Sequence, residues 1–208
     1  EADFDRGGRS VLGIRPLLWK NGWPVAGEVF KEGTYEIESE RRGYALELAV
    51  DFVRMGYTRH RFWEKDDTPV VPLKSQTLED VIGTWPQGKI NVRIGDYMFR
   101  PHQKWTITAV PDGGGYLGGP YYKIVIEGTN RALAATADAE VVTVPEFTGT
   151  PEQLWRIDQL TDGTYRIMPK EVPGTDKELV LVSVGDSTPS LGEFDMNSDN
   201  SKWNFRDH

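Results

Sequence analysis

The 208-residue sequence predicts an all-β fold built from three similar units. The first indication is a Gln-x-Trp triplet that recurs at nearly even spacing. The second is an alternation of apolar and polar side chains, as in Tyr122 to Ile126, which is typical of half-buried strands. The third is the division of the chain into short runs by 22 Gly and 13 Pro residues. A repeat of roughly 40 to 50 residues cannot bury its own apolar face, so three of them should close around one core.

Each unit carries three marks in the same order, and these marks define its elements. A Tyr-x-Ile triplet begins the unit, an apolar pair follows, and a tryptophan with an apolar residue two positions later ends it. The triplets begin at Tyr35, Tyr122 and Tyr165, the pairs are Ala45-Leu46, Ala132-Leu133 and Leu179-Val180, and the tryptophans are Trp105, Trp155 and Trp203. Three equivalent units predict a six-stranded barrel capped by three hairpins, with the three tryptophans buried as core near the axis. The side chain two positions before each tryptophan (Gln103, Gln153 or Ser201) should satisfy backbone groups in the turn.

The units are unequal in length. They cover about residues 33–110, 116–158 and 159–208, and the first carries an insertion at about 50–88. Tyr57, Trp63 and Trp85 lie in this insertion near the cationic run Arg59-His60-Arg61. Aromatic faces cover the C–H patches of a sugar ring and polar heads bind its hydroxyls, so the composition favours a carbohydrate site. The alternative is that these rings only fold the insertion onto the barrel as a satellite core.

Two other motifs are interpreted as connections. The glycines from Gly113 to Gly119 lack the lysine of a phosphate loop and are expected to form a flexible joint between the first two units. The stretch Asp195 to Asn200 has alternating oxygen ligands, but lacks the glycine and terminal glutamate of a calcium loop, so a polar turn is expected. The three histidines show no metal-ligand spacing. We therefore expect neither a metal nor a cofactor.

Taken together, the marks resemble the ricin-type β-trefoil lectin and carbohydrate-binding modules over roughly residues 30 to 208. The resemblance implies a β-trefoil with a long insertion in its first repeat. It also implies a sugar pocket in each repeat, made by an acidic residue after the apolar pair and a polar residue before Gln-x-Trp, with a stacking aromatic between them. The corresponding pairs are Glu47 and His102 in the first repeat, Ala134 and Glu152 in the second, and Val180 and Asn200 in the third.

Only the first repeat retains both polar groups, although Gly95 falls at its stacking position and Pro145 at that of the second repeat. A histidine such as His102 is more often a hydrogen-bonded loop residue than a ligand contact. By elimination, the expected carbohydrate site lies at the first repeat. Its predicted residues are Glu47, Tyr57, Trp63, Trp85 and His102.

The N-terminal segment shows a second, shorter resemblance. Val11 to Trp19 should be a strand, followed by a turn at Asn21-Gly22 and a second strand from Trp23. The pattern Ile-Arg-Pro-Leu-x-Trp followed by Gly-Trp-Pro-Val is similar to the segment that closes the catalytic domain of family 43 glycoside hydrolases, the arabinanase-like propellers. This resemblance implies that residues 1–28 are a hairpin and linker from an upstream catalytic domain and that residues 29–208 are the trefoil. An ordinary N-terminal hairpin is the alternative.

Composition narrows the class of partner. The net charge of −8 argues against nucleic acid and against an anionic membrane surface. The sequence has no Cys, which excludes disulfides and thiolate metal sites, and no apolar run approaches the ~18 residues of a membrane span. We expect a monomer, acting outside the cell or in the periplasm of a bacterium.

Two functions remain open. The first is a non-catalytic module that binds arabinan, arabinoxylan or related hemicellulose or pectin side chains for a parent family 43 hydrolase. The second is a structural accessory domain that packs on the propeller without binding sugar. An autonomous enzyme is less favoured, because no carboxylate pair stands out as catalytic.

Overall fold

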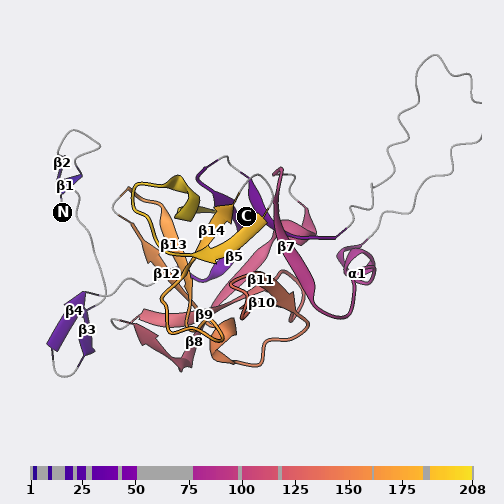
Figure 1. Ribbon diagram of the computed structural model, residues 1–208, viewed down its shortest axis with the longest axis horizontal. Coiled ribbons are helices and arrows are strands. Elements are labelled where there is room, and N and C mark those ends of the chain that lie inside the picture. The colour runs from indigo at the N-terminus through magenta and orange to yellow at the C-terminus, as the bar shows by residue number, and fades with distance from the viewer. Residues whose placement is uncertain are drawn as a thin grey trace, which may run out of the picture.

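The structure is a computed structural model, and it describes residues 2–3, 9–10, 17–20, 23–26, 30–41, 44–50, 77–97, 100–116, 119–160, 162–184 and 188–207. Its regular elements are almost all strands, with one short α-helix among the described residues, α1 (Leu78–Ile82). Figure 1 shows the strands of residues 33–207 gathered around one centre. No helix in the described part of the chain is long and apolar enough to cross a membrane.

Six of the described strands close a barrel. Each pairs with its neighbours antiparallel, in an order that returns from the last strand to the first. Around the barrel these strands are β5 (Gly33–Ser39), β8 (Trp105–Tyr116), β9 (Gly119–Ile126), β12 (Trp155–Gln159), β13 (Tyr165–Pro169) and β16 (Trp203–Asp207). Closure matters because it leaves no unpaired barrel edge.

Three hairpins complete the repeats. They are formed by β6 (Ala45–Leu48) with β7 (Ile90–Gly95), β10 (Ala132–Ala135) with β11 (Val141–Val144), and β14 (Val180–Val184) with β15 (Thr188–Gly192). Each hairpin lies in the sequence between two barrel strands, so every repeat consists of a barrel strand, a hairpin and a second barrel strand. This is the β-trefoil that the sequence predicted.

The three tryptophans occupy equivalent places. Trp105, Trp155 and Trp203 begin β8, β12 and β16, and each is 0% exposed. Each indole Nε1 donates a hydrogen bond to a carbonyl of its own repeat's hairpin, that of Leu46 at 2.8 Å, Leu133 at 3.0 Å and Leu181 at 2.8 Å, respectively. The bond satisfies the one polar group of a buried indole. Each tryptophan therefore fixes a hairpin to the barrel as well as filling the core.

The same hydrogen bonds correct one assignment. Leu181, and not Val180, is the third counterpart of Leu46 and Leu133, so the third apolar pair is Val180-Leu181. The pair Leu179-Val180 was wrong by one position because the loop after Tyr165 is longer than in the other repeats, and apolar residues run without a break from Leu179 to Val182. The counterpart of Glu47 is consequently Val182.

A one-turn 3₁₀ helix precedes each tryptophan, at Pro101–Gln103, Pro151–Gln153 and Asp199–Ser201. Gln103 Nε2 donates to the Asp96 carbonyl at 2.7 Å, and Gln153 Oε1 accepts from the Thr148 N–H at 2.7 Å. Ser201 Oγ donates to the Asp195 carbonyl at 3.1 Å. These side chains satisfy backbone groups in the turn as expected, and the shorter serine keeps that role in the third repeat.

Aromatic rings gather around Phe30, which precedes β5. Its ring centroid lies 5.3 Å from Tyr35, 5.9 Å from Tyr122 and 5.5 Å from Tyr165, the three tyrosines that begin the repeats. Phe205 packs against it at 4.5 Å. The Tyr122 hydroxyl also donates to the Phe30 carbonyl at 3.0 Å. The segment at Phe30 thus packs against all three repeats at once.

The sequence also predicted the roles of the glycine-rich stretch and of the N-terminal segment. The glycine-rich stretch does join the first two repeats, because it covers the end of β8 and the start of β9, and these paired strands have a register irregularity between Val110 and Gly115. In the N-terminal segment, β3 (Leu17–Lys20) pairs with β4 (Trp23–Ala26) in the register expected for a tight hairpin, Lys20 opposite Trp23. β1 (Ala2–Asp3) pairs with β2 (Arg9–Ser10). Residues 11–16, and residues 51–76 of the predicted insertion, lie outside the described residues.

Candidate functional site

The first-repeat motif position is occupied by a network of the protein's own side chains. Glu47 lies on β6 and is buried. Its Oε1 accepts from Arg93 Nε at 2.6 Å, and its Oε2 accepts from Gln103 Nε2 at 2.7 Å. His102 Nε2 lies 3.3 Å from the same Oε2. Both carboxylate oxygens are therefore engaged before any ligand arrives.

The electrostatics of Glu47 reflect this network. Burial alone raises the pKa of a carboxyl group, but hydrogen bonds from His102, Arg93 and Gln103 outweigh burial and hold the pKa of Glu47 below its ordinary value. The residue is thus a buried carboxylate stabilised by its partners. Such a group orders the β6–β7 hairpin and the following turn.

Gly95 explains why no aromatic stands at the first-repeat stacking position. A Cβ at Gly95 would lie 2.5 Å from Glu47 Oε1, so any side chain there would collide with the carboxylate. Glu47 itself fills the space that a stacking ring would need. The protein's own Glu47 side chain therefore occupies the motif site of the first repeat.

The predicted site residues are therefore placed as follows. Glu47 and His102 do lie together, but both are buried below the surface that the sequence assigned to them. Trp85 is 6% exposed and packs in the main hydrophobic core with the repeat tryptophans, so it has a packing role but not in a separate satellite core. Tyr57 and Trp63 lie outside the described residues, so their part in a sugar site stays a prediction.

The other two repeats offer no acceptor at the hairpin position. Ala134 and Val182 stand where the first repeat has Glu47. Glu152 accepts a hydrogen bond from Thr150 Oγ1 at 2.8 Å, within its own turn. The second and third repeats therefore lack the acidic group that the family pattern places after the apolar pair.

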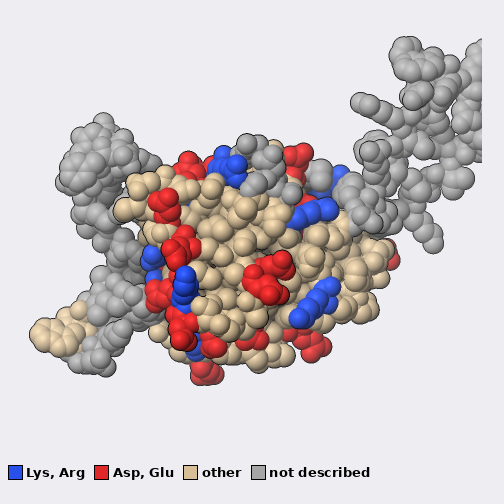
Figure 2. All heavy atoms as spheres, in the orientation of Figure 1, with Lys and Arg blue, Asp and Glu red and all other residues tan. Residues whose placement is uncertain are grey.

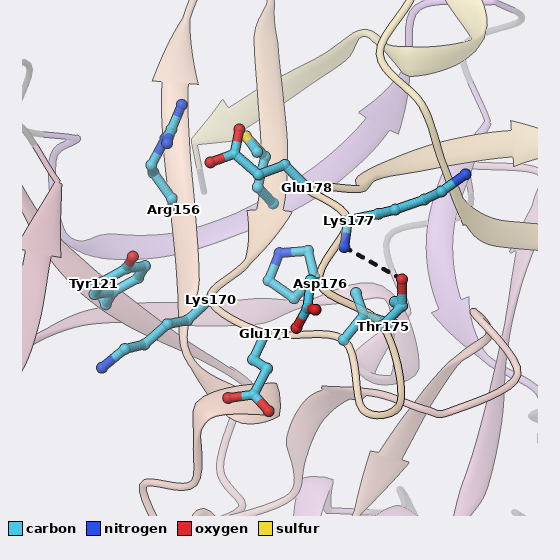
Figure 3. A pocket seen from close by; sticks show the side chains of 11 residues that line it. Tyr121, Arg156, Lys170, Glu171, Thr175, Asp176, Lys177 and Glu178 are labelled. Atoms are coloured by element: carbon cyan, nitrogen blue, oxygen red, sulfur yellow. Dashed lines mark hydrogen bonds between the residues drawn. The ribbon is translucent and has the colours of Figure 1, made fainter.

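An open pocket lies elsewhere, where the second repeat meets the third. It has a volume of about 380 Å³ and is lined by residues from β9, β12, β13 and the loop after β13. Figure 3 shows the side chains of Tyr121, Arg156, Lys170 and Glu178 around the same space. Met168, Pro169 and Val172 also line it, and all three are buried.

Basic and acidic side chains line this pocket in equal number, three of each: Arg156, Lys170 and Lys177 against Glu171, Asp176 and Glu178. The cations already have partners. Arg156 pairs with Asp158 at 2.7 Å, Lys170 donates to the Gly113 carbonyl at 2.6 Å, and Lys177 pairs with Glu193 at 3.2 Å. The acidic side chains make no ion pair or hydrogen bond within the described part of the chain. The lining charges balance in number, but Asp158 and Glu193 pair with two of the cations, so the pocket is acidic on balance and its carboxylates can accept hydrogen bonds.

Sequence reasoning missed this pocket because it lies outside every motif position. The available signal was the composition of the loop from Lys170 to Glu178, which places charged residues on both sides of Pro173-Gly174. A turn of that kind is expected to be exposed. The sequence does not show that Tyr121 and Arg156, from other strands, complete the wall.

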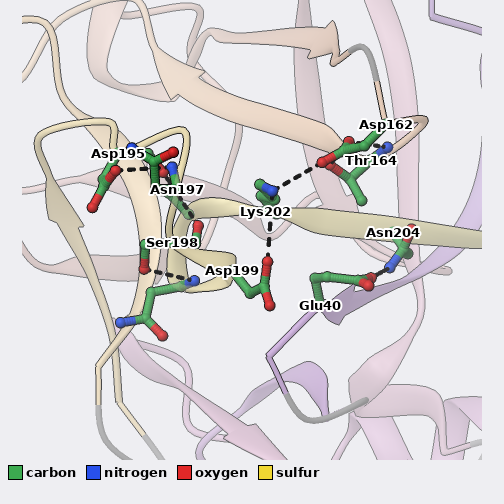
Figure 4. A network of polar contacts seen from close by, with 11 residues as sticks. Glu40, Asp162, Thr164, Asp195, Asn197, Ser198, Asp199, Lys202 and Asn204 are labelled. Atoms are coloured by element: carbon green, nitrogen blue, oxygen red, sulfur yellow. Dashed lines mark hydrogen bonds and ion pairs between the residues drawn. The ribbon is translucent and has the colours of Figure 1, made fainter. Parts of the chain in front are cut away.

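The polar turn of the third repeat has a structural role. Lys202 Nζ lies 2.9 Å from Asp162 Oδ2 and 3.5 Å from Asp199 Oδ1, as Figure 4 shows. Burial raises the pKa of Asp162, but hydrogen bonds from Thr164 and Lys202 lower it to about 2. Asp195 accepts from the Asn197 N–H at 2.9 Å, as expected of a polar turn. Among the described residues, no group of three or more His, Cys, Asp or Glu side chains is placed to hold a metal.

The outer surface carries charges of both signs. Figure 2 shows Lys and Arg interspersed with Asp and Glu on the face in view. No single-sign field of the kind that attracts a polyanion is visible on that face.

Comparison with known proteins places the fold. Residues 101–189 match the family described as ricin-type beta-trefoil lectin domain-like. No curated protein matches the sequence. The structure is similar to ThreeFoil, a designed threefold symmetric protein, with a TM-score of 0.54, 19% identity, and coverage of 85% of this chain and 100% of that one.

Two longer proteins are also similar. A Polyporus squamosus lectin, solved bound to a Neu5Acα2-6Galβ1-4GlcNAc epitope, gives a TM-score of 0.55 at 16% identity over 86% of this chain and 50% of that one. A mosquitocidal holotoxin gives 0.57 at 13% identity over 86% of this chain and only 18% of that one. Identities this low establish the fold alone. The family match supports a ricin-type β-trefoil lectin-like domain over residues 101–189, and the structures support its β-trefoil fold. None of them supports the resemblance of residues 10–27 to family 43 hydrolases.

Proposed function

We propose that this domain is a non-catalytic carbohydrate-binding module. The observation that carries the proposal is the threefold trefoil with its Gln-x-Trp turns, the architecture common to the matching lectin-like family. Because function depends on sites grafted onto a fold, an open polar pocket on this scaffold is also needed, and the molecule has one.

In its finer form, the proposal makes the module the C-terminal part of a bacterial hydrolase that degrades plant polysaccharide outside the cell or in the periplasm. The resemblance of residues 10–27 to a family 43 hydrolase segment supports this form and favours arabinan, arabinoxylan or a related side chain. Tethering raises the effective concentration of a catalytic domain at its polymer without any new catalytic contact.

Affinity electrophoresis tests the proposal directly. The domain should be retarded in gels that contain arabinan, arabinoxylan, pectin or a related polymer, relative to a non-binding protein of similar charge. A glycan array that includes the sialylated trisaccharide extends the panel to animal-type sugars. Unchanged mobility in every gel, together with an empty array, would exclude carbohydrate binding.

A non-catalytic module should also leave substrates intact. The purified domain is expected to release nothing from aryl-arabinosides or from arabinan, because the carboxylates of the proposed hydrolase belong to its upstream domain. Turnover that disappears when one of this chain's own Asp or Glu residues is replaced would assign catalysis to the trefoil.

A structural accessory role is the second candidate. The observation that favours it is the closed first-repeat site, where Glu47 is bound by Arg93 and Gln103 and no stacking ring fits over Gly95. If the domain has this structural role, its removal should lower the Tm of an attached catalytic domain but leave the retention of that domain on polysaccharide unchanged. Loss of retention at constant Tm would favour the binding module.

A further inference from the structure

We propose that the pocket between the second and third repeats binds a neutral, hydroxyl-rich sugar unit. The inference rests on the proposed carbohydrate-binding function and goes further by naming the place and the ligand class. The place is separate from all three motif positions, because neither Glu47, Ala134 nor Val182 lines the pocket.

The shape and lining suit one sugar unit of a longer chain. A volume of about 380 Å³ is at the lower end of small-molecule sites. The partly exposed ring of Tyr121 can pack against the C–H face of a sugar, and the buried Met168 and Pro169 add apolar lining. Lys170 Nζ lies 5.1 Å from the centroid of the Tyr121 ring, a cation–π contact that favours this placement of the ring.

The polar side chains of the pocket favour a ligand that carries hydroxyl groups. Glu171, Asp176 and Glu178 are exposed and have no partner within the described part of the chain, so they can accept hydrogen bonds from a ligand. A hydrogen bond to a charged group is stronger than one between neutral groups. Arg156 and Lys170 stand opposite as donors, although each already has one partner. The carboxylates accept hydrogen bonds and the Arg and Lys side chains donate them. Together they match the hydroxyl groups of a sugar, which both donate and accept.

Charge argues for a neutral ligand. The lining residues carry three positive and three negative charges, and the cations are already engaged by Asp158, Glu193 and a carbonyl. A uronate or sialate would meet the three carboxylates Glu171, Asp176 and Glu178, whereas Lys170 is the one lining cation without a carboxylate partner among the described residues. An anionic sugar is therefore disfavoured.

The wall of the pocket is fixed before a ligand arrives. The loop from Lys170 to Glu178 is anchored at Val172, which is buried in the core, and it is followed by buried Leu179. Val172 and Thr175 pair across its turn, where Gly174 takes a φ of +82° that favours glycine. A preformed wall limits the ordering entropy lost on binding.

Matched substitutions test the site. In affinity electrophoresis and calorimetric titration with arabinan, Glu178→Gln and Tyr121→Ala should each weaken binding about tenfold or more. The controls are Glu152→Gln and Asn200→Ala, which change the motif positions of the second and third repeats. They should bind like the wild type. Wild-type affinity should change little between low and high salt, and polygalacturonate, an anionic polymer, should bind more weakly than arabinan.

The possible failures are distinguishable. Wild-type protein that binds neither arabinan, arabinoxylan nor the glycan array overturns the proposed function, and this site with it. Binding that survives Glu178→Gln and Tyr121→Ala, but is lost in Glu152→Gln or Asn200→Ala, overturns the site and keeps the function. Preference for polygalacturonate overturns the neutral ligand class. Circular dichroism of each variant confirms that lost binding is not lost folding, and Glu178→Gln preserves the side-chain shape if Tyr121→Ala unfolds.

Discussion

At the scale of single residues, buried polar groups explain the most about this molecule. The indoles of Trp105, Trp155 and Trp203 each combine a large apolar surface with one hydrogen bond to a hairpin carbonyl. Glu47 does the opposite, because it is a buried charge that is stable only through its partners. Removing either kind of group leaves an unsatisfied partner inside the protein.

Replacing Trp155 with Ala should lower the free energy of unfolding by about 3–5 kcal/mol, through lost burial and the cavity left behind. Trp155→Phe retains much of the volume but leaves the Leu133 carbonyl without its donor, so a smaller loss of about 1–3 kcal/mol is expected. Urea unfolding of both variants measures the difference. Equal stability of Trp155→Phe and wild type would show that the indole hydrogen bond contributes nothing.

The loss of stability in acid also depends on single residues. The pKa of Glu47 is lowered in the folded protein, and that of Asp162 falls from 3.8 to about 2. The unfolded state therefore takes up protons first, so these groups stabilise the fold above their unfolded pKa values. This contribution is lost as the pH falls, for Asp162 between 3.8 and about 2.

Unfolding by urea at a series of pH values should show this loss. An Asp162→Asn variant should have a shallower decline between pH 4 and pH 2 than the wild type, in line with the window set by its two pKa values. The same slope in both proteins would mean that Asp162 does not carry the effect.

At the scale of elements, the β8–β9 hairpin shows what glycines do in this fold. Gly115 lies where two strands approach closely, and a Cβ there would come 2.4 Å from the Gly119 carbonyl oxygen. Backbone atoms cannot yield as a flexible side chain can. Gly115 thus permits the close approach of the two paired strands that join the first repeat to the second.

Gly115→Ala should therefore destabilise the protein by about 1–3 kcal/mol through overpacking. Gly88→Ala is the matched control, because nothing lies within 4 Å of a Cβ at Gly88. That change should alter stability by less than about 0.5 kcal/mol. Thermal unfolding of both variants measures the difference in stability. Equal Tm values would contradict the close approach of β8 and β9 at Gly115.

At the scale of the whole molecule, the barrel depends on a residue outside the repeats. Phe30 contacts the three repeat tyrosines and Phe205, so it couples parts of the chain that are far apart in sequence. Phe30 is therefore part of the packed trefoil, whereas the domain start at residue 29 stays a prediction.

A fragment of residues 29–208 should fold, whereas Phe30→Ala in that fragment should cost about 3–5 kcal/mol. Near-ultraviolet circular dichroism and urea unfolding report tertiary packing and stability, respectively. Unaltered stability of the Phe30→Ala fragment would show that the barrel closes without this ring.

The sequence by itself determined the threefold all-β fold. Tyr35, Trp105 and their counterparts recur in a fixed order, and a repeating pattern of buried aromatics has few ways to close. The hairpin at Trp23 and the role of the residue two positions before each tryptophan follow from equally local rules. These features depend on residues close together in the chain.

Only the tertiary structure decided where an open pocket lies. The closure of Glu47 depends on Arg93 and Gln103 approaching from other elements, and the burial of Trp85 depends on the barrel beneath it. The open pocket likewise brings Tyr121, Arg156 and the Lys170–Glu178 loop together from three parts of the chain. Motif spacing specifies which residues share a repeat, whereas exposure and contact between repeats arise from packing, which no local pattern encodes.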